Sequence, residues 1–163
     1  MRTSVLRLAI QAAGSVALAT SFSAVAATWT ADTHILVSGQ FDHDGRADLL
    51  VIAKDPSQPS GIALNNGSGQ PSVFHQSWAS GYLGITWSGG TYVPHVGDFD
   101  GDNYDDIFLQ RTSGGDHHVL LNDGTGRFTQ KHQTISNSYL GVNWSQAERR
   151  IVGEAADLNR VIA

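Results

Sequence analysis

The chain has 163 residues, with 15 acidic side chains, 10 basic side chains and no cysteine. The formal net charge of −5 argues against nucleic acid or an anionic membrane surface as a partner. The lack of cysteine excludes disulfide bonds, so we expect the core, bound metal or assembly to stabilise the fold.

Residues 1–26 have the order of a secretory signal peptide. Arg2 and Arg7 come first, an apolar and Ala-rich stretch follows, and Ala24-Val25-Ala26 is a typical cleavage site. The apolar stretch is too short and too rich in small residues for a membrane span. We therefore expect cleavage, a secreted or periplasmic location, and a mature chain with a net charge of −7, because the two arginines are removed.

The rest of the chain is a repeat. The segment from Trp29 aligns without a gap with the segment from Trp87, at an offset of 58 residues. A third copy begins at Trp144, and the sequence ends inside it. The predicted divisions are residues 1–26, 27–86, 87–143 and 144–163: signal peptide, first repeat with linker, second repeat with linker, and a partial, degenerate third repeat.

Each repeat predicts four short strands joined by tight turns. In the second repeat we expect strands at residues 91–99, 106–111, 117–122 and 127–132. Pro94 lies in the first of them and favours an edge strand or a bulge. Four strands per repeat is typical of a propeller blade, although a repetitive sandwich or a β-solenoid has similar features. The predicted fold is all-β: an incomplete propeller with two four-stranded antiparallel blades and a partial third.

Five aspartates lie within residues 98–106, which we call the second loop. Numbered from Asp98, the carboxylates fall at positions 1, 3, 5, 8 and 9. Alternating oxygen groups on a tightly curled loop suit a hard cation such as Ca²⁺. The predicted ligands are Asp98, Asp100, Asp102, Asp106 and the backbone carbonyl of Tyr104.

The other residues of the second loop have different expected roles. Phe99 is expected to anchor the loop in the core, and Asp105 is expected to face solvent. An EF-hand is excluded because its position 12, a bidentate Glu, is Leu109 here and the flanking segments are strands. A pair of solvated acidic turns is the alternative, because Asp, Asn and Gly are common turn residues.

The stretches "GDFDGDNYDDIFL", "GQFDHDGRADLLV" and "LNDGTGRF" resemble the FG-GAP repeat, also called the VCBS repeat. The resemblance covers nearly the whole chain after residue 26, and it implies a four-stranded blade with Ca²⁺ between its first two strands. For residues 40–48, which we call the first loop, it implies ligation by Gln40, Asp42, Asp44, the Arg46 carbonyl and Asp48. Gln40 replaces an aspartate, so we expect weaker binding there.

The third copy departs further from the repeat. It keeps Gly153 and the pair Asp157-Leu158 but lacks most of the acidic loop. We therefore predict no cation in residues 144–163.

The predicted function is binding rather than catalysis, because the sequence holds no nucleophile elbow and no converging zinc ligands. We expect a secreted, calcium-binding module for recognition or adhesion, with an extracellular protein or glycan as ligand. The alternatives are a propeller-type lectin, in which Trp29, Trp87 and Trp144 could form sugar-stacking platforms, or a fragment of a larger secreted propeller protein or enzyme. Two blades cannot close a propeller, so a homo-oligomer could complete the ring.

Overall fold

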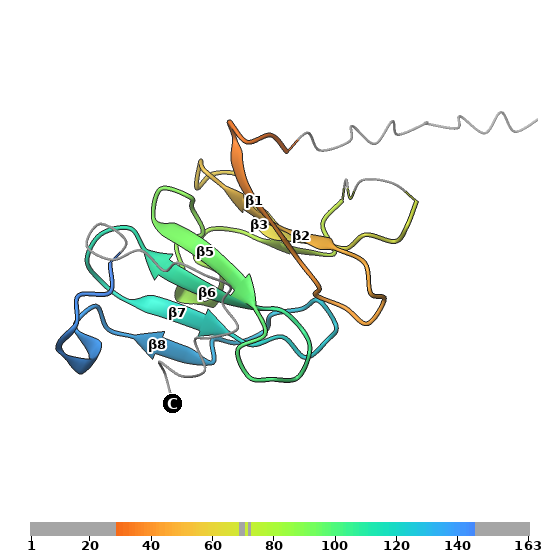
Figure 1. Cartoon of the computed structure of the whole chain (residues 1–163). Helices are drawn as coiled ribbons and strands as arrows, with labels where there is room; N and C mark the ends of the chain where they lie inside the picture. Colours follow the sequence, from red (N-terminus) through yellow and green to blue (C-terminus); the bar gives the residue numbers. More distant parts are fainter. Residues whose placement is uncertain (1–28, 69–70, 72, 146–163) are drawn as a thin grey trace, which may run out of the picture.

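The computed structural model describes residues 29–68, 71 and 73–145. These residues form two four-stranded antiparallel sheets, each with its strands in chain order. Figure 1 shows the two sheets beside each other. The predicted signal peptide and the end of the predicted third repeat lie outside the described residues. The first sheet contains β1 (His34–Gly39), β2 (Asp48–Ala53), β3 (Ser60–Ala63) and β4 (Gln76–Trp78). The second contains β5 (Tyr92–Gly97), β6 (Asp106–Arg111), β7 (His117–Leu120) and β8 (Gln133–Ile135).

The sheets repeat each other in register. Gly39 pairs with Asp48 at the start of β2, and Gly97 pairs with Asp106 at the start of β6. Each acidic loop therefore connects the first two strands of a sheet, as predicted. Pro94 lies on β5, which is an edge strand of its sheet. Because β5 has a neighbouring strand on one side only, the missing N–H of Pro94 removes no hydrogen bond to a strand on the other side.

The fourth strand is displaced from its prediction. It was expected at residues 127–132, but β8 is Gln133–Ile135. The backbone N–H and carbonyl of Phe128 are instead bound by the side chain of Gln76 in the first sheet, at 2.7 and 3.1 Å. Phe128 is thus held by the neighbouring sheet rather than by its own.

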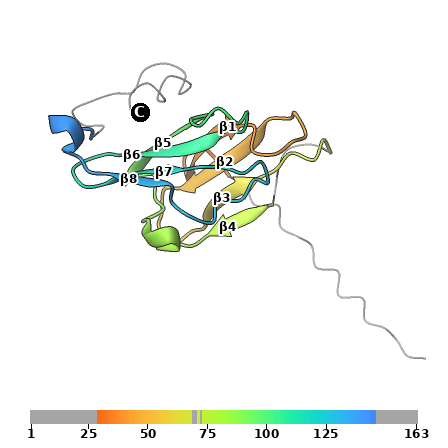
Figure 2. The same ribbon diagram turned by 90° about the horizontal axis from the view of Figure 1, so that it is seen from below.

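The largest hydrophobic cluster lies between the sheets and joins them. Leu50, Ile52 and Ile62 of the first sheet share it with Ile107, Leu109 and Leu120 of the second. Phe108 alternates with Ile107 and Leu109 and belongs to a second cluster, on the opposite face of β6. Since β1 and β5 also contact each other, the two sheets are adjacent blades of an incomplete propeller (Figure 2).

A short 3₁₀ turn follows each blade: η1 (Tyr82–Gly84) and η2 (Tyr139–Gly141). Leu83 and Leu140 have left-handed backbones in these turns, with φ of 56° and 57°. Leu83 packs against the cluster between the blades, whereas Leu140 is 71% exposed. The same local sequence therefore has two environments among the described residues, because Leu83 lies against the cluster that the two blades share.

Trp87 follows η1 and belongs to the hydrophobic cluster between the blades. It is 1% exposed and lies 4.3 Å from Trp78, measured between ring centroids. Its indole N–H donates to the carbonyl of Tyr82 at 2.9 Å. No helix in the described part of the chain is long and apolar enough to cross a membrane.

Candidate metal centre

The second loop gathers three of its predicted carboxylates. One oxygen from each of Asp98, Asp100 and Asp106 lies within 4.8 Å of the other two. Asp102 is not part of this group, and its Oδ1 accepts a hydrogen bond from the N–H of Tyr104 at 2.9 Å. Ligation by Asp102 and by the Tyr104 carbonyl therefore stays a prediction.

Backbone N–H groups curl the loop around Asp98. Its Oδ1 accepts from Gly101 and Asp102 at 2.6 and 3.1 Å, and its Oδ2 accepts from Asn103 at 2.9 Å. Gly101 and Asn103 have positive φ values of 86° and 74°, which Gly and Asn tolerate better than other residues. The loop is thus closed by its own first carboxylate.

Asp106 is the buried end of the second loop. It is 0% exposed, and its two oxygens accept from the N–H groups of Phe99 and Asn122 at 2.8 Å each. Burial raises the pKa of Asp106 to about 7, although these hydrogen bonds oppose the shift, and the charges of Asp100 and Asp102 add to it. A cation among these carboxylates would offset that cost, so the second loop fits a hard cation.

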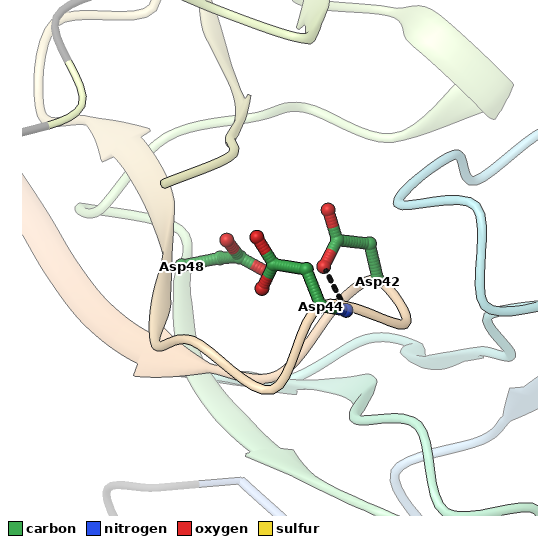
Figure 3. A group of neighbouring side chains, drawn as sticks. All are labelled: Asp42, Asp44 and Asp48. Atoms are coloured by element: carbon green, nitrogen blue, oxygen red, sulfur yellow. Dashed lines mark hydrogen bonds between the residues drawn. The ribbon is translucent and has the colours of Figure 1, made fainter. Parts of the chain in front are cut away.

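The first loop has a similar arrangement. Asp42, Asp44 and Asp48 bring one oxygen each to within 4.8 Å of one another, and Figure 3 shows the three side chains side by side. Asp48 is buried like Asp106, and it accepts from Phe41 and Asn65 at 2.9 and 2.8 Å. Burial likewise raises the pKa of Asp48.

Arg46 makes the first loop different. Its guanidinium lies 2.6 Å from Asp44 Oδ2, and its N–H donates to Asp44 Oδ1 at 2.8 Å. The backbone bond is the main cause of the lowered pKa of Asp44. The second loop has Tyr104 at this position, so only the first loop holds an arginine side chain that would compete with a metal ion. The position of the Gln40 amide and of the Arg46 carbonyl as ligands stays a prediction.

Asp105 corrects an expectation. It was predicted to face solvent, but it is half-buried and its Oδ2 accepts from the N–H of Gln40, in the first loop, at 2.7 Å. Its own N–H donates to the Gln40 carbonyl at 2.9 Å. Comparison of the two repeats could not predict this contact, because the matching residue of the first blade is Ala47, which has no polar side chain.

Asn122 is a further residue of the site that the sequence reasoning missed. Its side-chain amide donates to the carbonyls of Phe41 and Asp105, at 2.9 and 3.2 Å. The repeat contained a signal, since "LNDG" matches "LNNG" in the first blade and places Asn65 at the same position. Asn65 bonds only within its own blade, where its amide donates to Ala47 at 3.2 Å.

Fold and site together define a propeller-type β-repeat with an acidic loop between the first two strands of each blade. Residues 40–109, which contain both loops, match the family described as FG-GAP-like repeat, and this part of the chain is therefore an FG-GAP-like repeat segment. This match confirms the family that the motifs indicated. No curated protein and no solved structure matches the chain.

Proposed function

We propose that the protein is a calcium-binding propeller repeat module, exported from the cytoplasm, that acts in recognition or adhesion. The observation that carries the calcium proposal is the repeated loop, in which three carboxylates gather and one of them belongs to a buried aspartate. Carboxylate oxygens are the ligands that Ca²⁺ prefers, and converging carboxylates repel one another when no cation is present. Export is supported by the pattern of residues 1–26.

A binding role, rather than catalysis, is supported by the repeat architecture and by the lack of a catalytic signature in the sequence. The ligand class we propose is an extracellular protein or glycan. The buried Trp87 is not available as a sugar-stacking platform, whereas Trp29 and Trp144 are half-buried. A glycan array in calcium distinguishes the two ligand classes, and lack of sugar binding at any calcium concentration would leave protein recognition.

The test of calcium binding is the melting temperature of the full chain in calcium and in chelator. A cation that binds only the folded state adds about 2.7 kcal/mol at a concentration of 100 Kd. We expect Asp100→Ala to remove most of this gain and to change stability little in chelator, because Asp102 N–H keeps its bond to Asp98. The matched control is Asp116→Ala, an exposed aspartate in the turn between β6 and β7.

Two results would overturn the calcium proposal. The first is a melting temperature that does not respond to calcium in the wild type. The second is an equal loss for Asp100→Ala in calcium and in chelator, which would mean that Asp100 acts without metal.

A further inference from the structure

The two acidic loops are joined directly across the boundary between the blades. Asp105 and Gln40 exchange two hydrogen bonds, through Asp105 Oδ2 at 2.7 Å and the Gln40 carbonyl at 2.9 Å. Tyr104 and His43 form a hydrogen bond between the phenol oxygen and Nδ1, and their rings lie 4.3 Å apart. Each contact joins a residue of the second loop to a residue of the first.

Asn122 and Thr125 strengthen this connection from the segment after β7. The Asn122 amide bridges Phe41 of the first loop and Asp105 of the second. Its backbone N–H donates to Asp106 at 2.8 Å. Thr125 pairs with Asp42 in an isolated antiparallel bridge. The buried end of the second loop and the start of the first are thus held by the same short segment.

These contacts lie at the candidate ligand positions. Asp105 stands between Tyr104 and Asp106, at positions 7 and 9 of the second loop. Its partner Gln40 is position 1 of the first loop, where a neutral amide replaces a carboxylate. Ordering the second loop around an ion therefore also holds Gln40, and the conformational entropy of the first loop is partly lost before its own ion arrives.

We propose that the two loops bind cations with positive coupling, and that Asp105 is the positioning residue that connects them. This inference rests on the proposed function, in that both loops must bind calcium. Occupation of the second loop raises the affinity of the first, and by linkage the first raises the affinity of the second by the same factor. Electrostatic repulsion between two bound dications would instead make the coupling negative, and it weakens as the salt concentration rises. The sign of the measured coupling therefore shows which of the two effects is larger.

The experiment is calcium titration of the full chain by calorimetry and equilibrium dialysis at physiological salt. The affinity of the first loop is measured in the wild type and in Asp98→Asn/Asp100→Asn, which disables the second loop. We expect a loss of about fivefold or more. The reciprocal variant, Asp42→Asn/Asp44→Asn, should weaken the second loop by the same factor.

Asp105 is tested in the same cycle. Asp105→Ala places alanine in the second loop, as Ala47 does at the matching position of the first, and removes the side-chain contact with Gln40. We expect it to lower the coupling factor. Asp105→Asn removes the charge but keeps an oxygen that can accept from Gln40, so we expect it to retain most of the coupling. If both variants lose the coupling equally, charge rather than positioning connects the loops, and the role of Asp105 is overturned.

The outcomes separate the two proposals. A wild type that binds no calcium overturns the proposed function. A wild type that binds two ions, with affinities that do not depend on the other loop or that decrease when it is filled, overturns only the coupling. Circular dichroism of each variant in chelator checks that the comparison is made between folded chains.

Discussion

The side-chain amide of Gln76 binds both backbone groups of Phe128, 52 residues away and in the other blade. Oε1 accepts from the Phe128 N–H at 2.7 Å, and Nε2 donates to the Phe128 carbonyl at 3.1 Å. The hydroxyl of Tyr82 donates to the same carbonyl at 2.8 Å. The side chain of Gln76 therefore makes the two hydrogen bonds that a neighbouring strand would otherwise make with Phe128, and it links the two blades.

We predict that Gln76→Ala lowers the free energy of unfolding by about 1–3 kcal/mol, because it leaves the Phe128 N–H without its acceptor. The matched control is Gln133→Ala, at the same repeat position in β8. The side chain of Gln133 makes no hydrogen bond with the described residues. Urea denaturation in chelator measures both, and equal losses for the two variants would contradict the prediction.

Gly124 lies beneath the contact between Tyr104 and His43, with a φ of 78°. A Cβ at this position would lie 2.8 Å from His43 Nε2 and 2.8 Å from Tyr104 Cε2. Gly45 has a similar φ of 73°, but nothing lies within 4 Å of its Cβ position. Comparing alanine substitutions at Gly45 and Gly124 therefore distinguishes the cost of backbone strain, which both positions share, from the cost of steric overlap, which only Gly124 has.

We predict that Gly124→Ala destabilises the chain by about 1 kcal/mol or more beyond Gly45→Ala, whose cost is backbone strain of about 1–2 kcal/mol. Thermal unfolding in chelator provides the comparison. Similar losses of stability for Gly124→Ala and Gly45→Ala would contradict the prediction. They would mean that His43 and Tyr104 can move away from the new Cβ at no cost to stability.

Asp48 and Asp106 are predicted to stabilise their blades without metal as well as with it. Replacing either by Ala leaves two backbone N–H groups without acceptors, at Phe41 and Asn65 or at Phe99 and Asn122. The expected loss is about 2–5 kcal/mol in chelator. Asp100→Ala should cost far less under that condition. A loss for Asp106→Ala that appears only in calcium would show that its main role is ligation.

His118 gives a prediction for pH. Its ring accepts or donates hydrogen bonds with Tyr92 at 3.1 Å and Thr134 at 3.3 Å, and burial, with a smaller effect of Lys131, lowers its pKa from 6.5 to about 4. Because the folded pKa lies below the unfolded value, the folded state binds fewer protons. The contribution of His118 to stability is therefore complete above pH 6.5 and is lost as the pH falls towards 4.

We expect His118→Gln to reduce the loss of stability between pH 7 and pH 4 by about 1–3 kcal/mol. The measurement is urea denaturation across this range in chelator, with the exposed His132→Gln as the control. Parallel stability curves for wild type and His118→Gln would contradict the prediction. Because only differences between variants are used, the opposite pH effect expected from Asp106, whose pKa is raised, cancels.

Strand β6 shows what local sequence could predict. The apolar run after the second loop predicted a strand at residues 106–111, and the observed strand has these bounds. Alternation of side chains on a strand and turn residues at its ends are local features, so they are visible in the sequence. The same holds for the position of both acidic loops between the first and second strands.

Residues 127–132 show where local sequence was insufficient. Phe128 and Thr129 have high strand propensity, but the side chain of Gln76, from the other blade, binds the backbone of Phe128. The strand forms later in the chain, at Gln133–Ile135. Gln76, 52 residues away, competes with the sheet for the backbone hydrogen bonds of Phe128, and a contact at this separation cannot be predicted from the local sequence.

The sequence by itself determined the repeat, the all-β class and the candidate ligands of each loop. The repeat is a match between two stretches of the sequence, and the strands and loops depend on spacing within a few residues. Tertiary structure alone decided that Asp105 binds Gln40 rather than solvent, that Asn122 bridges the two loops, and that Leu83 is covered while Leu140 is exposed. Each of these depends on which surface lies beside the residue once the blades pack. Equivalent residues of a repeat share local geometry, but they do not share neighbours.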